Sequence, residues 1–525
     1  MHAAAVQSWQ ASEAPAVAHR YLRLLPCLTD FAFILPLFLL FGMLSGTHQL
    51  FSDGDTGWHL RTGDWILEHR AVPHTDLFSF SMPDKAWYAW EWGWDVAFAA
   101  VNKWTGLAGV AFLNVLLLSL VSVLVFRLIR RYSDNDLLAF AFTMLAVCGS
   151  IIHWLARPHL ISWVFALVFC HLILSFERGN RAALLATPLL VVIWTNLHGG
   201  FFLGIFLLVA SALGEAAQVT FGADKPTLSS YRRSFEYVGY SLVCTAATLL
   251  NPYGWQLHQH VARYLSNSSL LDSITEFQSI SFHQPGSIFF ESMLMIGVAA
   301  AFWCFVQRRV AMGITVLFWA HEALFAGRNI PLFMLLSAAP AALLTQDLLN
   351  KLRDCAAIDR LTGSIQEIVQ ELKPLERVGR SYLLSGAALL FVGLNLAAGT
   401  PGFRPEFNPT DFPAATLQLA HNAGVNHLFT IDQWADYLIY RYYPNQRVFM
   451  DGRTDLYGTG LVNKYQRIMT AQYDCEALLN KFSIDGVLVK PDTPLATVLK
   501  HSPGWQVLFD NGSAILFRRS LAPNG

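Results

Sequence analysis

The stretch Ser52-Asp53-Gly54-Asp55-Thr56-Gly57-Trp58-His59-Leu60-Arg61-Thr62-Gly63-Asp64-Trp65 decides how this chain is interpreted. It opens a polar segment, 51–104, that lies between two long apolar runs. The segment holds carboxylates, a histidine, arginines and many tryptophans, and it is too polar to cross a bilayer. We interpret it as a loop at a membrane surface that forms the floor of a candidate active site.

The composition places much of the remaining chain in a bilayer. Of the 525 residues, 54% are hydrophobic and 14% are charged, with a mean hydropathy of +0.39. Soluble domains carry about 25% charged residues, so the sequence indicates an α-helical polytopic membrane protein. The net charge of −1 argues against a general affinity for nucleic acid or anionic lipid. The seven cysteines have no metal-site or disulfide spacing.

A window of about 19 residues predicts about eleven transmembrane helices. They lie near 30–50, 106–127, 137–155, 159–176, 183–197, 200–219, 236–251, 288–306, 310–326, 329–346 and 380–398. Lys and Arg favour the cytoplasmic ends of spans, and their distribution predicts a cytoplasmic N-terminus and an outer C-terminus. The predicted inside residues are Arg20, Arg23, Arg127, Arg130, Arg131, Arg178, Arg181, Lys225, Arg232, Arg233, Arg308, Arg309, Lys351, Arg353, Arg360, Lys373, Arg377 and Arg380.

This topology divides the chain into three parts. They are a cytoplasmic N-terminus (1–29), a transmembrane module (30–398) and an extracytoplasmic domain (399–525). The module includes the long first outer loop (51–105) and a cytoplasmic loop (346–379).

The first outer loop has an amphipathic pattern. Arg61, Asp64 and Glu68 fall on one stripe of a helix over 58–70, and apolar residues occupy most of its other positions. This pattern predicts a helix lying in the membrane interface. A tryptophan-rich return, expected at headgroup depth, follows with Trp87, Trp90, Trp92, Trp94 and Trp104.

The C-terminal region alternates short apolar segments with helical patterns, which predicts a small α/β domain. Strands are expected at 427–431, 447–450, 486–489, 505–509 and 514–517, and helices at 413–422, 458–470, 476–482 and 494–499. Asp510-Asn511-Gly512-Ser513 is a hairpin turn signal between the last two strands.

Short polar motifs all fall on the predicted outer face. Besides the first loop they are Ala156-Arg157-Pro158-His159, Asn196-Leu197-His198-Gly199-Gly200, Asn251-Pro252-Tyr253-Gly254, Glu276-Phe277 and Gly327-Arg328-Asn329. A one-sided concentration of ionisable groups at span ends indicates a site on that face.

These motifs resemble bacterial membrane proteins related to the GT-C glycosyltransferase superfamily. The resemblance covers roughly 30–520. It rests on Asp-x-Asp-x-x-Trp-His from Asp53, the cluster Trp87-Tyr88-Ala89-Trp90-Glu91-Trp92, the outer motifs above, Arg328-Asn329-Ile330-Pro331, and Asp451-Gly452-Arg453-Thr454-Asp455-Leu456-Tyr457. The link to protein O-mannosyltransferases and lipid A aminoarabinose transferases rests on topology and one acidic first loop.

The resemblance implies a transferase that takes a sugar from a polyprenyl-phosphate donor. A first-loop carboxylate then serves as base or holds a divalent cation such as Mg or Mn. That role falls on Asp55, with Asp53 as second choice. The alternative is that Asp55 or Thr56 caps the helix that follows.

The reaction chemistry selects further candidates. Inverting transfer needs a carboxylate to deprotonate an acceptor hydroxyl, and Glu91 is a second carboxylate for this purpose, or otherwise an exposed charge. The leaving phosphate needs a metal or arginines. Arg157 and Arg328 are candidates for phosphate binding, or else they snorkel to headgroups.

Four further residues are candidates for substrate binding, each with a structural alternative. They are His59, His159, His198 and Glu322. Asp451, Arg453 and Asp455 resemble a tight polar turn with a structural role.

The sequence therefore predicts a glycosyltransferase of the inner (cytoplasmic) membrane. Its acceptor is a lipid, glycan or protein on the outer face. The alternative is a non-enzymatic protein: a transporter or flippase for lipid-linked saccharides, or an assembly scaffold. Transporters carry ionisable groups near the membrane midplane, and the predicted span interiors have few, Glu215 and Glu322 being exceptions.

Overall fold

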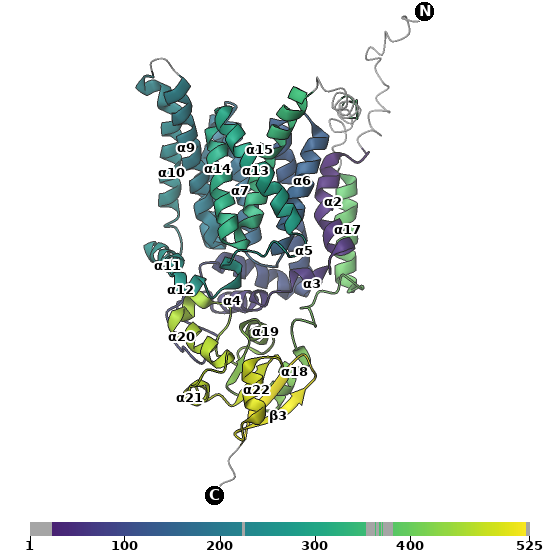
Figure 1. Ribbon diagram of the computed structural model, residues 1–525, viewed down its shortest axis with the longest axis vertical. Helices are drawn as coiled ribbons and strands as arrows, with labels where there is room; N and C mark the ends of the chain where they lie inside the picture. The colour runs from purple at the N-terminus through teal and green to yellow at the C-terminus, as the bar shows by residue number, and fades with distance from the viewer. Residues whose placement is uncertain are drawn as a thin grey trace, which may run out of the picture.

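The computed structural model describes residues 24–222, 226–352 and 382–520, together with residues 363, 367, 368 and 370. It places an upper bundle of long helices above a layer of short helices and a mixed α/β domain (Figure 1). Several basic residues used for the topology prediction lie outside the described residues. They are Arg20, Arg23, Lys225, Arg353, Arg360, Lys373, Arg377 and Arg380.

The upper bundle contains a helix at the position of each predicted span. These are α2 (Leu28–Phe38) with η1 (Leu39–Met43), α5 (Trp92–Tyr132), α6 (Asp136–Ser150), α7 (His159–Glu177), α8 (Thr187–Leu197), α9 (Phe202–Gly222), α10 (Arg232–Ala247), α13 (Ser287–Val306), α14 (Val310–Phe325), α15 (Ile330–Lys351) and α17 (Leu383–Ala398). Among the described residues, six helical segments are long and apolar enough to cross a membrane. The apolar helices are confirmed, whereas the number of crossings and their orientation stay predictions.

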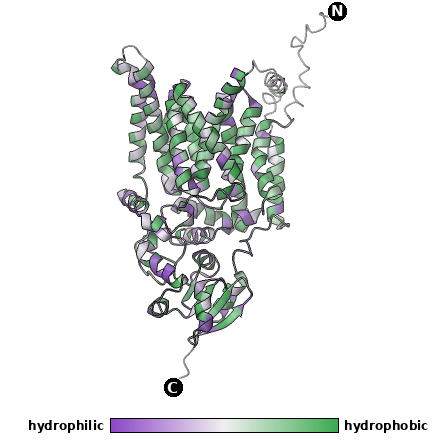
Figure 2. Cartoon of the chain, in the orientation of Figure 1, coloured by the Kyte–Doolittle hydropathy of each residue, from purple (hydrophilic) through white to green (hydrophobic). Residues whose placement is uncertain are grey.

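Hydropathy separates the bundle from the region beneath it. The long helices are predominantly hydrophobic, and hydrophilic residues gather at their lower ends and in the lower helices (Figure 2). Helix α5 joins the two regions. Gly106, which adopts φ +64°, interrupts this helix between a first segment and a long apolar segment. A positive φ is easily adopted only by glycine.

The layer beneath the bundle is built from the first loop. It contains α3 (Thr47–Leu50) and α4 (Asp55–His69), and α4 packs against α5 and against α19 of the lower domain. The helix expected at 58–70 is therefore present but begins earlier, at Asp55. Its apolar residues Trp58, Leu60 and Ile66 are buried by protein. Its location in the membrane interface stays a prediction.

The tryptophans after α4 differ in how far their side chains are exposed. Trp87 and Trp94 are buried within the protein, whereas Trp104 is 86% exposed. Of these three, only Trp104 has the exposure expected of a headgroup anchor.

The lower domain is a four-stranded mixed sheet covered by helices. Its elements are α18 (Ala414–Asn422), β1 (Leu428–Thr430), α19 (Asp432–Tyr442), α20 (Thr454–Met469), α21 (Cys475–Lys481), β2 (Gly486–Val489), α22 (Pro494–His501), β3 (Trp505–Asp510) and β4 (Ile515–Arg519). The strand order is β1-β2-β4-β3, with β1 parallel to β2 and the other two pairs antiparallel. The α/β class and the last hairpin are confirmed.

One prediction for this domain is wrong, and one helix was missed. Residues 447–450 form no strand of the sheet; Val448 instead makes an isolated parallel bridge with Ser79 of the first loop. Helix α19 was not predicted; its residues 434–439 are buried at six consecutive positions, because it packs against both the first loop and the lower domain. Both segments join the lower domain to the first loop and so position the site.

Candidate active site

A cavity of about 500 Å³ lies where the bundle, the first loop and the lower domain meet. Seven of the nine predicted site residues line it: Asp55, Glu91, Arg157, His159, His198, Glu322 and Arg328. The other two, Asp53 and His59, contact residues that do. Residues distant in sequence thus share one cavity on the predicted outer face.

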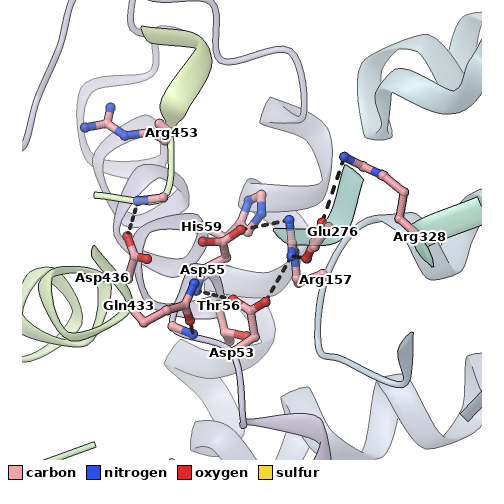
Figure 3. A network of polar contacts seen from close by, with 12 residues as sticks. Asp53, Asp55, Thr56, His59, Arg157, Glu276, Arg328, Gln433, Asp436 and Arg453 are labelled. Atoms are coloured by element: carbon pink, nitrogen blue, oxygen red, sulfur yellow. Dashed lines mark hydrogen bonds and ion pairs between the residues drawn. The ribbon is translucent and has the colours of Figure 1, made fainter. Parts of the chain in front are cut away.

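Arg157 is at the centre of the charged end of this cavity (Figure 3). Its Nη1 is 3.0 Å from Asp53 Oδ2, and its Nη2 is 2.8 Å from Asp55 Oδ2. Nη1 also pairs with Glu276 in η6 (Thr275–Phe277). The other Glu276 oxygen is 3.9 Å from Nη1 of Arg328, whose guanidinium stacks on Phe277. Glu276 therefore bridges the two predicted phosphate-binding arginines.

In this cluster, burial and the neighbouring charges shift the pKa values in opposite directions. Burial alone would raise the pKa of Glu276, but the neighbouring Arg157, His153 and Arg328 lower it to about 2. Burial raises the pKa of Asp55 to about 7, although Arg157 opposes the change. Burial would lower the pKa of Arg157, yet the adjacent carboxylates hold it well above its usual value. At neutral pH the arginine is charged and Glu276 ionised.

The Asp53–Gly57 turn packs tightly against α19. Asp53 Oδ1 accepts a hydrogen bond from the Asp55 N–H at 2.8 Å, and the Gly54 N–H donates to Gln433 Oε1 at 2.6 Å. A Cβ atom on Gly54 or Gly57 would collide with the α19 backbone. The alternative that Asp55 or Thr56 caps the helix is wrong: Gly54 is the N-cap, without a side-chain cap. The Asp55 side chain is therefore free for other contacts.

Asp436 of α19 lies behind Asp55 and was not predicted. Its Oδ1 accepts a hydrogen bond from the Gly452 N–H at 3.0 Å. Its Oδ2 and the Oδ1 of Asp55 are both buried without a hydrogen-bond partner, and both lie close to where a Gly452 side chain would project. Burial, followed by the charge of Asp55, raises the pKa of Asp436 well above its usual value. No sequence pattern signalled this residue.

Glu91 lines the same cavity and lies between two histidines. Its Oε2 is 3.8 Å from His59 Nε2, and its Oε1 is 3.6 Å from His198 Nε2. Burial raises the pKa of Glu91 to about 8, with Arg157 and Arg328 opposing. Behind it, His59 Nδ1 is 2.6 Å from Asp95 Oδ1. Asp95 was also missed, although its position four residues after Glu91 places both on one face of α5.

The remaining candidates have partners that suit structural roles. The Nε2 of His159 lies 2.8 Å from the carbonyl oxygen of His153. Asn329 Nδ2 donates to Glu322 Oε2 at 3.2 Å. Both His159 and Glu322 line the cavity, so their contact with a substrate stays a prediction.

Arg453 ties the first loop to the lower domain. It pairs with Asp451 at 2.6 Å and with Asp76 at 2.7 Å, and it stacks on Phe78 and Trp87. Every one of these residues is buried. This network fixes the loop that carries Glu91 against the lower domain.

The divalent cation expected at Asp53 and Asp55 has few ligands available there. Both carboxylates are paired with Arg157. Among the described residues, no group of three or more His, Cys, Asp or Glu side chains has metal-site geometry. As the structure places them, these residues do not fit a resident metal.

Comparisons with known proteins test the fold. No protein-family model matches the sequence, and no curated protein matches it either. The structure resembles the apo crystal structure of the Archaeoglobus fulgidus oligosaccharyltransferase, with a TM-score of 0.53 and 13% identity over 96% of this chain and 74% of that one. The same values apply to the archaeal oligosaccharyltransferase AglB from Archaeoglobus fulgidus in complex with an inhibitory peptide and a dolichol-phosphate. At this identity the likeness concerns fold alone: over nearly its whole length this chain shares the fold of that oligosaccharyltransferase.

Proposed function

We propose that this protein is a membrane glycosyltransferase that transfers a sugar from a polyprenyl-phosphate donor to an acceptor hydroxyl, with inversion at the anomeric carbon. The observation that carries the proposal is one cavity lined by two arginines and by Glu91, a carboxylate that has no ion pair with an arginine among the described residues. The fold likeness to an oligosaccharyltransferase, one structure of which contains a dolichol-phosphate, supports the donor class.

The arginine end suits a leaving phosphate. Arg157 and Arg328 converge on Glu276, and a phosphate oxygen is an equally good partner for a guanidinium. In our proposal the donor phosphate takes the place of the Glu276 carboxylate between the two arginines. Their charges then stabilise the negative charge that develops on the phosphate as the glycosidic bond breaks.

The apolar wall of the cavity suits the lipid part of the donor. Phe202 of α9 and Phe318 and Phe325 of α14 line the cavity and remain at least one-third exposed. Helices α9 and α14 pack against each other, so these aromatic residues follow one seam at the surface of the bundle. A polyprenyl chain leaving along this seam stays in lipid while its phosphate reaches the arginines.

The hydroxyl group that accepts the sugar must lose its proton to a base. The predicted carboxylates differ in their surroundings. Asp53 and Asp55 are paired with Arg157, whereas Glu91 has no ion pair with an arginine among the described residues. We therefore assign Glu91 as the base. Asp55, supported by Asp53, then holds Arg157 in its phosphate-binding orientation. This refines the sequence-based assignment, which placed Asp55 first.

Transfer is tested with purified protein in lipid nanodiscs and a panel of short-chain polyprenyl-phosphate sugars. We expect at least one donor to release its polyprenyl phosphate, and the Glu91→Gln and Arg157→Gln variants to lower that rate about 100-fold or more. Arg181→Gln, an arginine of η3 (Arg181–Ala186) away from the cavity, serves as the control. The proposal is refuted if the donor binds but is never cleaved and is instead moved from one leaflet to the other in proteoliposomes. That result supports the flippase alternative.

A further inference from the structure

A second cavity lies at the opposite end of the helix bundle from the candidate active site. Its volume is about 470 Å³, within the range of about 300–1,000 Å³ that is usual for small-molecule sites. Helix α7 joins the two cavities, because it begins at His159 in the active-site cavity and ends at Glu177 in the second one. Helix α9 leads in the same way from Phe202 to Glu215. The proposed transfer reaction does not use the second cavity.

The length of α7 places the second cavity at the depth of lipid headgroups. The helix has 19 residues, so it is about 28 Å long at about 1.5 Å per residue. The hydrocarbon core of a bilayer is about 30 Å thick. With the active-site cavity at the predicted outer surface, the second cavity therefore lies near the headgroups of the inner leaflet.

Charged side chains of both signs line the second cavity. They are the cations Arg131, Arg178, Arg233 and Arg309 and the anions Glu177 and Glu215. Glu215 is also one of the two ionisable residues that the sequence places within a span. Ionisable side chains in such segments usually pair with one another or with a ligand. The partners of these charges therefore decide whether the cavity is a binding site.

These charges neutralise one another only in part. The Nη1 of Arg233 lies 3.9 Å from Glu215 Oε1, which is a long ion pair. Arg309 lies over the ring of Tyr132, and in the described part of the chain it has no carboxylate within 4 Å. The carboxylate of Glu177 likewise has no ion pair or hydrogen bond with any described residue. The second cavity thus offers both a cation and an anion that lack a partner of opposite charge.

A ligand of one sign would leave the other charge unpaired, which is costly away from bulk water. A phosphate suits the arginines, because guanidinium groups form charge-assisted hydrogen bonds with phosphate oxygens. A primary ammonium, which has several N–H donors, suits Glu177. Phosphoethanolamine carries both groups. Leu207 of α9 and Leu336 of α15 line the same cavity, and such an apolar wall suits the acyl chains of a lipid.

We propose that the second cavity binds the headgroup of phosphatidylethanolamine from the inner leaflet. The phosphate lies between Arg178 and Arg309, and the ammonium donates hydrogen bonds to Glu177. One nitrogen of Arg178 donates to the carbonyl oxygen of Arg131, which orients the guanidinium and leaves its other N–H groups for the phosphate. The lipid is bound without being consumed, so this site is separate from the transfer reaction.

Native mass spectrometry of the intact protein in detergent tests the headgroup with dioleoyl lipids. We expect the wild type to bind phosphatidylethanolamine about tenfold more tightly than phosphatidylcholine, whose trimethylammonium has no N–H donor. Phosphatidylglycerol, which lacks the ammonium, should also bind more weakly. Equal affinities, or a preference for either of these two lipids, overturn the proposal. Soluble glycerophosphoethanolamine should bind much more weakly than the lipid, and an equal affinity overturns the assignment to a lipid.

Variants of the same protein test the residues. Glu177→Gln should reduce the affinity for phosphatidylethanolamine to that for phosphatidylcholine, whereas Arg309→Gln should weaken the binding of both lipids. Glu236→Gln is the matched control, because Glu236 lies on α10 and pairs with Arg232 outside the second cavity. A Glu177→Gln variant that keeps the wild-type preference overturns the proposal. Since none of these lipids is a sugar donor, the result does not depend on whether the transfer reaction occurs.

Discussion

Replacing Arg157 by glutamine removes the guanidinium that pairs with Asp53, Asp55 and Glu276. The pairing with Glu276 is reflected in the pKa of that carboxyl, which falls from 4.5 to about 2. At 1.36 kcal/mol per pKa step, this difference corresponds to about 3 kcal/mol. Arg328 and His153 contribute part of it, so we expect a coupling energy of about 2 kcal/mol between Arg157 and Glu276.

A double-mutant cycle measures this coupling. The free energy of unfolding is obtained by SDS titration in mixed micelles for the wild type, Arg157→Gln, Glu276→Gln and the double variant. Arg157→Gln should cost about 3 kcal/mol or more, because it leaves buried carboxylates without their cation. The double variant should be more stable than the sum of the two single losses predicts. The pair Arg232 and Glu236, 3.0 Å apart on α10 with the arginine side chain 64% exposed, is the control, with a coupling below about 0.5 kcal/mol.

The sign of the pH dependence gives a second check on the same cycle. The folded-state pKa of Glu276 is depressed, so its stabilisation is present above the unfolded value of 4.5 and is lost as the pH falls toward 2. The coupling should therefore be full at pH 7.5 and smaller at pH 3. Additive single variants, or a coupling that does not change with pH, would refute the charge cluster as described.

Three further predictions follow from the same geometry. Gly57→Ala should destabilise the contact between α4 and α19 by about 2 kcal/mol, because its Cβ would collide with the Asp436 carbonyl oxygen; hydrogen exchange in α19 should rise, whereas Gly460→Ala, with open space around it, should leave exchange unchanged. The kcat/KM for transfer should increase with pH and level off above about 8, since Glu91 must be ionised to act as a base; a rate that falls over this range excludes Glu91 as the base. Burial raises the folded-state pKa of Asp55 from 3.8 to about 7, so its contribution to stability should be lost as the pH rises through 7. Thermal unfolding measured between pH 5 and 8.5 should show that the Asp436→Asn variant loses less stability over this pH range than the wild type.

The apolar helices and much of the cavity lining could be predicted because their signals are local in sequence. A span is a continuous apolar run, and Arg157, His198 and Arg328 each follow or precede such a run. Once the predicted topology assigns the ends of these apolar runs to one face of the membrane, the polar residues at those ends are expected to lie together. For this reason the sequence alone assigns Asp53 and Arg157, which are 104 positions apart, to one site.

The parts that could not be predicted depend on contacts between domains. Asp436 lies on a helix that was not predicted, and its proximity to Asp55 arises only when α19 packs on the first loop. Val448 looked like a sheet strand because it is apolar and extended, yet its partner is Ser79. Asp95 is in the first turn of α5, where an acidic residue is ordinarily explained by the helix dipole.

In the proposed reaction Arg157 and Arg328 bind the phosphate of a polyprenyl donor, while Glu91 faces the acceptor hydroxyl. A structure of the wild-type protein in nanodiscs with a bound polyprenyl phosphate tests it most directly. We expect phosphate oxygens within hydrogen-bonding distance of both guanidinium groups, about 3 Å. Glu276 should be displaced from between them, and the lipid chain should lie along the seam of α9 and α14. A phosphate bound elsewhere, with Glu276 still joining the two arginines, would contradict it.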